Sequence, residues 1–166
     1  WIVTMEALAP FRTTAFERAA DDPQPLPYLS SAANEAGGGV DIDMEVLVSS
    51  AKMRAEGTAP ALLGASKFKD MYWTVAQMIT HHAIGGCNLK PGDVCGSGTV
   101  SGETEDSYGS LLELSWAASR NFQLPSGEER TFLADGDEVL MKAHCSAPGA
   151  RRIGFGDCRA EIIAAD

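Results

Sequence analysis

One side chain that could carry chemistry is Glu113, which stands among large apolar residues in the run Leu-Leu-Glu-Leu-Ser-Trp. In an extended strand, Glu113 would point away from Leu112 and Leu114, because successive side chains alternate between two faces. A carboxylate that simply faces water is the plainest interpretation. The apolar neighbours leave a second one open, in which a partly buried carboxylate has a raised pKa and acts as an acid, a base or the orienter of a histidine.

A second candidate is the hexapeptide Ser-Gly-Thr-Val-Ser-Gly at residues 97–102. Glycines beside hydroxyl residues allow backbone N–H groups and the hydroxyl of Thr99 to approach an anion. The stretch is not a nucleotide phosphate loop, because that loop requires a lysine that is missing here. On its own, the pattern is more typical of a tight turn between strands.

The third candidate is the pair His81-His82. Neighbouring side chains on a helix diverge by about 100°, so the two imidazoles cannot easily share one metal ion. Helix capping or packing is the expected role of this pair. His144, alone in a predicted strand, carries no functional signal. The residues by themselves therefore contain no complete catalytic triad, metal set or cofactor loop, and indicate only an α+β domain.

A helix is predicted to carry the histidine pair. Apolar residues from Phe68 to His82 recur at the spacing of a helical face, Ser66 is a suitable N-cap, and Gly85-Gly86 is a stop signal. We therefore expect one long amphipathic helix over about residues 66–84.

The rest of the chain is predicted to be β-rich. Residues 40–53 alternate between apolar and polar types, which indicates a strand that is bulged near Val46. Residues 30–39 and 57–64 are expected to be loops. Further strands are predicted at residues 1–8, 94–100, 111–117, 122–124, 131–133, 138–144, 152–155 and 158–163. The expected fold is a single α+β domain over residues 1–166, a mixed sandwich or roll with one long helix.

Composition excludes several classes of partner. The chain of 166 residues has a net charge of −10, which argues against binding to nucleic acid or to an anionic membrane surface. No apolar run is long enough to cross a membrane. The four cysteines form no Cys-x-x-Cys pair, so we expect reduced thiols in a cytoplasmic protein.

Long motifs in a fixed order make the chain resemble the fumarylacetoacetase family. The resemblance rests on Trp-Ile-Val-Thr-Met-Glu-Ala-Leu at residue 1, Lys-Asp-Met-Tyr-Trp-Thr at 69, Gly-Cys-Asn-Leu-Lys-Pro-Gly-Asp at 86, Gly-Thr-Val-Ser-Gly at 98, Gly-Ser-Leu-Leu-Glu-Leu-Ser-Trp at 109, Phe-Leu-Ala-Asp-Gly-Asp-Glu-Val at 132 and Arg-Ile-Gly-Phe-Gly at 152. The resemblance implies that the chain is the C-terminal part of a catalytic domain of this family and has the β-rich fold of that part.

The resemblance also implies a reaction. Members of this family hydrolyse a carbon–carbon bond of 4-fumarylacetoacetate, in tyrosine and phenylalanine breakdown. They use Mg²⁺ or Ca²⁺ together with a His–Glu pair that activates water, while Lys, Arg and Gln groups stabilise charge. Glu113 matches the glutamate of that pair, and Thr99 matches a threonine that contacts the carboxylate end of the substrate. The matching histidine, lysine and metal ligands would all lie before Trp1, so no residue here is assigned to metal.

The resemblance therefore predicts a homodimeric enzyme of which this chain is only a part. Because the opening residues look like a strand without a lead-in, we expect Trp1 to be a cut edge and the chain alone to be inactive. Two alternatives stay open. One is a related enzyme that acts on another β-dicarbonyl acid, and the other is a non-catalytic dimerisation module.

Overall fold

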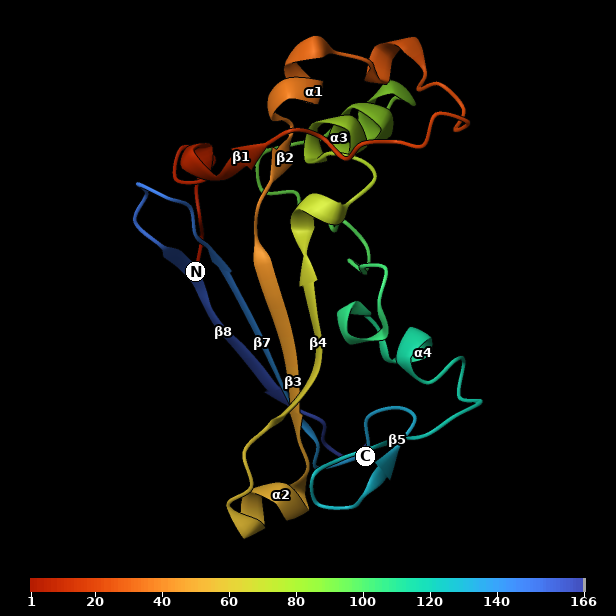
Figure 1. Cartoon of the computed structure of the whole chain (residues 1–166), viewed down its shortest axis with the longest axis vertical. Helices are drawn as coiled ribbons and strands as arrows, with labels where there is room; N and C mark the ends of the chain where they lie inside the picture. The colour runs from red at the N-terminus through yellow and green to blue at the C-terminus, as the bar shows by residue number, and fades with distance from the viewer. Residues whose placement is uncertain (166) are drawn as a thin grey trace.

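The computed structural model describes residues 1–165, and its centre is a four-stranded sheet. The strand order is β4 (Ala61–Lys67), β3 (Asp43–Ser49), β7 (Glu138–Cys145) and β8 (Ile153–Glu161), with every neighbouring pair antiparallel. Figure 1 shows this sheet along the long axis of the molecule, with α1 (Ala32–Gly37) and α3 (Val75–Ile84) at one end, α2 (Ala51–Glu56) at the other and α4 (Leu111–Leu114) beside the sheet. The arrangement agrees with the predicted α+β class.

The predicted strand over residues 40–53 is confirmed in its central part, β3, whereas residues 51–53 belong to a helix, α2. The irregularity expected near Val46 is present, but the extra residue is Leu63 on β4, because Val46 pairs with Gly64 and Leu47 with Leu62. The pairing of β3 with β4 shifts register between Val46 and Leu47. The pairing of β7 with β8 shifts between Lys142 and His144. The two strands expected at 152–155 and 158–163 form one continuous strand, β8. Such irregularities increase the local twist of a sheet.

Two short antiparallel strand pairs and several short helices complete the fold. β1 (Arg12–Thr13) pairs with β2 (Gly39–Val40), and β5 (Phe122–Gln123) pairs with β6 (Glu129–Arg130). The α-helices are α1 (Ala32–Gly37), α2 (Ala51–Glu56), α3 (Val75–Ile84) and α4 (Leu111–Leu114), and the 3₁₀ turns are η1 (Ala9–Phe11), η2 (Pro27–Leu29), η3 (Phe68–Asp70) and η4 (Glu105–Ser107).

The single long helix over residues 66–84 is a wrong prediction. Ser66 belongs to β4, and the chain then passes through η3 before α3 begins after Thr74. Thr74 is the true N-cap: its hydroxyl accepts from the Gln77 N–H, and the Gln77 side chain accepts from the Thr74 N–H. This capping box satisfies two helix N–H groups that otherwise lack partners, so the helix starts there. None of the described helices has the length and apolar character needed to cross a membrane.

Other predicted boundaries also differ from the structure. Residues 1–8 and 94–100, which are described in full, contain no strand, and the strand expected at 131–133 is replaced by β6 just before it. The expected loop at 30–39 contains α1, with Ser31 as its N-cap. The expected loop at 57–64 ends early because β4 begins at Ala61.

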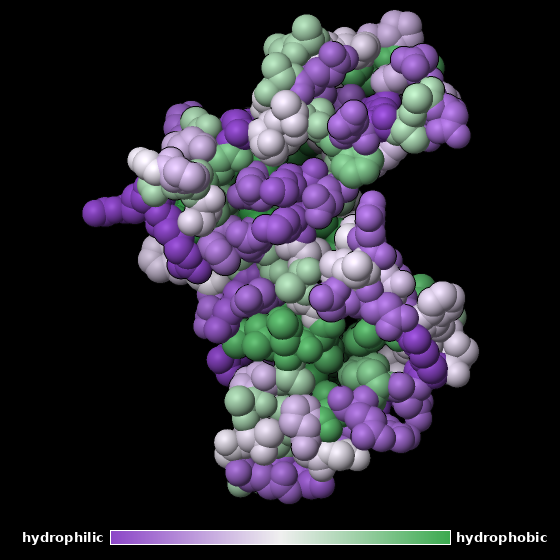
Figure 2. Space-filling model, in the orientation of Figure 1, coloured by the Kyte–Doolittle hydropathy of each residue, from purple (hydrophilic) through white to green (hydrophobic). Residues whose placement is uncertain are grey.

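Two separate apolar clusters form the core. One contains Leu8, Phe11, Val40 and Cys145. The other contains Val48, Met53 and Leu124. They lie on either side of the middle of the sheet, and Figure 2 shows apolar residues exposed on the surface between its two ends. Burial raises the pKa of the Cys145 thiol, and all four cysteines are free.

A buried ion-pair network ties β6 to the start of β7. The guanidinium of Arg130 donates to both carboxylate oxygens of Asp137 at 2.9 and 3.0 Å and to Glu128 at 3.1 Å. Burial alone would raise the pKa of Asp137, but hydrogen bonds from Arg130 and from the Ala134 N–H outweigh it and hold the pKa below its usual value. The hydroxyls of Ser50 and Ser126, with Arg130, lower the pKa of Glu128 to about 2.

Candidate functional site

Glu113 lies on the one-turn helix α4, and not on a strand as the alternating pattern predicted. The N-cap of α4 is Ser110, whose hydroxyl accepts a hydrogen bond from the Glu113 N–H at 3.3 Å. A serine followed three residues later by a glutamate is a typical helix start. The alternation over residues 111–117 is also imperfect, because Leu111 and Leu112 are both apolar, so it does not outweigh that local signal.

Two serine hydroxyls hold the carboxylate of the half-buried Glu113. Ser101 Oγ and Ser110 Oγ each donate to Glu113 Oε2 at 2.8 Å. Both donors therefore occupy the same oxygen, and Oε1 forms no hydrogen bond with any residue in the described part of the chain. A carboxylate fixed through one oxygen presents the other in a defined direction to a further donor.

Gly109 links this carboxylate to the segment that carries Thr99. The Gly109 N–H donates to Ser101 Oγ at 3.0 Å. A Cβ at position 109 would lie 2.2 Å from the Val100 carbonyl oxygen and 2.8 Å from Thr99 Cγ2. The two segments thus approach so closely that only glycine fits between them. The structure brings the two predicted site residues, Thr99 and Glu113, onto adjoining segments.

Thr99 is exposed and lines a groove of about 350 Å³ over the sheet. Its opposite wall comes from β3, β7 and β8, through Met44, Met141 and Phe155 among others. Gly98, with φ of +79°, precedes Thr99 in an extended segment, and the tight turn between strands expected from the hexapeptide is not present at residues 97–102. The groove is mainly apolar, and the Thr99 hydroxyl is one of its few polar groups.

The central sheet contacts α4 and the segment that precedes it. Leu111 and Leu114 of α4 face Val46, Leu63 and Leu133 around a small apolar cavity of about 100 Å³. A Cβ at Gly64 on β4 would meet the carbonyl oxygen of Tyr108 at 2.5 Å. The segment before α4 therefore rests directly on β4, as Figure 1 shows for the two elements. The position of Glu113 is determined by the sheet and not by a free loop.

The three histidines lie elsewhere. His81 Nδ1 is 3.0 Å from the Tyr28 hydroxyl, and the two rings are stacked, which agrees with the expected packing role. His82 is exposed. His144 Nε2 lies 3.5 Å from Asp43. None of them contacts Glu113 within the described residues.

The described residues do not bring a set of metal-binding side chains together. Over residues 1–165, no group of three or more His, Cys, Asp or Glu side chains is arranged to hold a metal ion. Hard cations such as Mg²⁺ and Ca²⁺ require several oxygen ligands. The described residues therefore do not by themselves fit such an ion.

Sequence reasoning missed Ser101 and Ser110, the residues that position Glu113. The spacing of Ser110 and Glu113 was the available signal. Ser101 has no comparable signal, because it is brought to Glu113 from a separate segment, twelve residues away in the chain.

The chain is similar to one family of known proteins. Residues 1–163 match the family model described as fumarylacetoacetate (FAA) hydrolase C-terminal. The fumarylacetoacetase of Dictyostelium discoideum is 45% identical over 168 residues, covering 100% of this chain and 37% of that protein. The bovine fumarylacetoacetase is 44% identical over 166 residues, covering 99% and 37%. The human fumarylacetoacetase is 42% identical over 166 residues, also covering 99% and 37%.

The chain spans 37% of the length of these relatives. The match nevertheless extends over almost all of its own residues, including the segments that carry Thr99, Ser101 and Glu113. The chain therefore belongs to the fumarylacetoacetate hydrolase family.

Proposed function

We propose that this chain is the C-terminal portion of a fumarylacetoacetase, an enzyme that hydrolyses a carbon–carbon bond of 4-fumarylacetoacetate to give fumarate and acetoacetate. Its place would be in tyrosine and phenylalanine breakdown. The relatives named fumarylacetoacetase support this proposal. The observation that carries it is the geometry of Glu113, whose Oε2 is held by two serines while Oε1 is left without a partner among the described residues.

Glu113 acts through a histidine that this chain does not supply. Its Oε1 accepts the N–H of that imidazole, which fixes the tautomer and the ring orientation. The other ring nitrogen can then take a proton from water, and the nearby carboxylate stabilises the imidazolium that results. The two serine hydroxyls keep the carboxylate in place, so that it need not reorganise during the reaction.

Thr99 binds substrate in the same proposal. Its hydroxyl can donate to a carboxylate oxygen of a dicarbonyl acid that lies in the groove over the sheet. The apolar walls provided by Met44, Met141 and Phe155 favour the carbon chain of the substrate.

The intact enzyme would use Mg²⁺ or Ca²⁺, with ligands outside the residues described here. A divalent cation polarises a carbonyl and stabilises developing negative charge. The intact enzyme is further proposed to be a cytoplasmic homodimer that acts on a small molecule, and not to bind nucleic acid or a membrane.

A complementation assay tests the proposal. The 166-residue chain alone is expected to leave 4-fumarylacetoacetate unchanged. The same chain, joined to the remaining N-terminal part of one of its relatives, is expected to hydrolyse it in a metal-dependent manner. Turnover by the isolated chain would contradict the proposed division of the site. A folded chimera without turnover, beside an active parental relative, would contradict the proposed activity.

A further inference from the structure

One face of the central strand β7 is open in its middle. The odd-numbered side chains of β7 share this face, because successive side chains of a strand point to opposite sides. Val139 packs against one of the two core clusters, and Cys145 belongs to the other. Met141 and Ala143 lie between them and line the groove that carries Thr99. On β7, the floor of this groove is therefore two residues long.

The neighbouring strand β3 repeats this arrangement. Met44 pairs with Ala143, and Val46 pairs with Met141. Both β3 residues line the same groove, so the floor consists of two rows of side chains. Successive side chains on one face of a strand are about 7 Å apart. Two such rows give room for a short carbon chain that lies along the strands.

The two rows differ in depth on β7, because Ala143 has a single methyl group and Met141 a long, flexible side chain. Met141 is 50% exposed, more than any other large apolar side chain of this groove. Methionine adapts its shape to the molecule that it contacts and is common at binding surfaces. Its row partner Val46 also borders the small cavity beneath α4. Met141 therefore narrows the groove at the end nearest the helix that carries Glu113.

We propose that Met141 determines the length of the acyl chain that the enzyme accepts. This inference rests on the proposed function, in which Thr99 binds the carboxylate end of the substrate. The carbon chain between this carboxylate and the bond that is cleaved would lie over Ala143, with the Met141 side chain against its far end. Additional methylene groups in this part of the substrate would collide with Met141 or move the cleaved bond away from Glu113. Met141 is thus a specificity-determining residue and takes no part in proton transfer.

A kinetic comparison of two substrates tests this inference, in the chain joined to the N-terminal part of a relative. One substrate is 4-fumarylacetoacetate, and the other is a homologue with two additional methylene groups between the carbon–carbon double bond and the terminal carboxylate. The unsubstituted enzyme is expected to prefer the shorter substrate. Met141→Ala should shift the ratio of the two kcat/KM values towards the longer one by at least about tenfold, because one methylene group in a hydrophobic pocket changes kcat/KM by about 10- to 200-fold.

Three further variants separate specificity from stability. Met141→Leu keeps nearly the same volume and should retain the preference of the unsubstituted enzyme, whereas the bulkier Met141→Phe should shift the ratio further towards the shorter substrate. Leu62→Ala is the matched control, because Leu62 on β4 is 56% exposed. Leu62 pairs with Leu47, whose side chain points away from the groove because it alternates with that of Val46. Leu62→Ala should therefore leave the ratio unchanged.

The outcomes distinguish this inference from the proposed function. Ratios that stay unaltered in both Met141→Ala and Met141→Phe would overturn the inference, and so would an equal shift in Leu62→Ala. Either result leaves the proposed function in place, because the unsubstituted enzyme still hydrolyses 4-fumarylacetoacetate. If the unsubstituted enzyme does not hydrolyse that substrate, the proposed function is contradicted, and the role of Met141 with it.

Discussion

Ser101 Oγ donates a hydrogen bond of 2.8 Å to Glu113 Oε2 and accepts one of 3.0 Å from the Gly109 N–H. One hydroxyl thereby joins the segment that carries Thr99 to the helix that carries Glu113. Because Ser101 acts on the carboxylate and not on substrate, we regard it as a positioning residue. The direction of the free carboxylate oxygen depends on it.

Removal of the Ser101 hydroxyl is expected to slow the reaction without weakening substrate binding. In the complemented enzyme, Ser101→Ala should lower kcat by about tenfold, the effect of losing one hydrogen bond to a charged group, and leave KM nearly unchanged. Steady-state kinetics provide the measurement. Ser97→Ala, in the same segment but without a hydrogen bond to Glu113, is the matched control. A rise in KM with an unaltered kcat would contradict the positioning role.

Gly109 should tolerate no side chain. A Cβ at this position would overlap the Val100 carbonyl oxygen at 2.2 Å, so Gly109→Ala must push the two segments apart. We expect a loss of about 2 kcal/mol in the free energy of unfolding, measured by urea denaturation. Gly85→Ala is the control, because a Cβ there meets no atom within 4 Å. Equal free energies of unfolding for the two variants would contradict the close approach of Gly109 to the Val100 carbonyl.

The buried ion pair between Arg130 and Asp137 should be the most sensitive polar contact in the fold. The side chain of Asp137 is only 1% exposed, so Asp137→Ala leaves the Arg130 guanidinium without its main partner. Breaking such a pair from one side costs about 3 kcal/mol in the free energy of unfolding. Asp135→Ala, at an exposed turn position nearby, should cost far less. Thermal or urea denaturation of the two variants decides between these outcomes.

Glu128 should make stability depend on acidic pH. Its pKa is about 2 in the folded chain, against an ordinary value of 4.5. A lowered folded-state pKa contributes stability above the unfolded-state value, and this contribution is lost as the pH falls from about 4.5 towards about 2. Glu128→Gln should therefore be less stable than the unsubstituted chain at about pH 6, with the difference shrinking in acid.

Denaturation midpoints measured across this pH range test the Glu128 prediction. Glu103→Gln, which removes an exposed carboxylate, should follow the unsubstituted chain at every pH. A difference between Glu128→Gln and the unsubstituted chain that stays constant down to the acid limit would mean that the Glu128 carboxylate is not stabilised by Ser50, Ser126 and Arg130.

The sequence predicted the central strands well and the helix starts poorly. The strand through Val46 and the strand over residues 138–144 are present, because alternation of apolar and polar residues over many positions is a strong signal. The irregularity near Val46 is also present, but its extra residue is Leu63 on the neighbouring strand β4. The helix expected from Ser66 begins after Thr74, and the strand expected around Glu113 is a helical turn. In both places a hydroxyl residue three positions before Gln77 or Glu113 marked the start, and this local capping signal outweighed the apolar periodicity.

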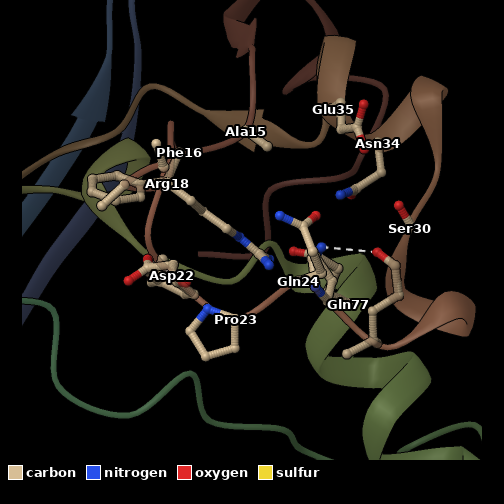
Figure 3. Close-up of a pocket in the computed structure, with 15 residues that line it drawn as sticks. Ala15, Phe16, Arg18, Asp22, Pro23, Gln24, Ser30, Asn34, Glu35 and Gln77 are labelled. Atoms are coloured by element: carbon tan, nitrogen blue, oxygen red, sulfur yellow. Dashed lines mark hydrogen bonds between the residues drawn. The ribbon is translucent and has the colours of Figure 1, made fainter.

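The candidate site was predictable only as separate residues. The resemblance to a family indicated Thr99 and Glu113, but not that Gly109 and Ser101 join them. That link depends on a close approach between segments, which no local pattern in the sequence records. The sequence also contained no sign that Arg18 Nη1 and Asn34 Nδ2 (Figure 3) are buried without a hydrogen-bond partner among the described residues, since a missing acceptor can be recognised only from coordinates.

Substitution of Glu113 tests the central claim most directly. In the complemented enzyme, Glu113→Gln keeps the size of the side chain but removes the charge that would orient and stabilise a histidine. We expect kcat for 4-fumarylacetoacetate hydrolysis to fall by at least about 100-fold, while Glu103→Gln stays active and both variants remain folded. A Glu113→Gln enzyme with unaltered kcat would contradict the assignment of Glu113 to the catalytic site.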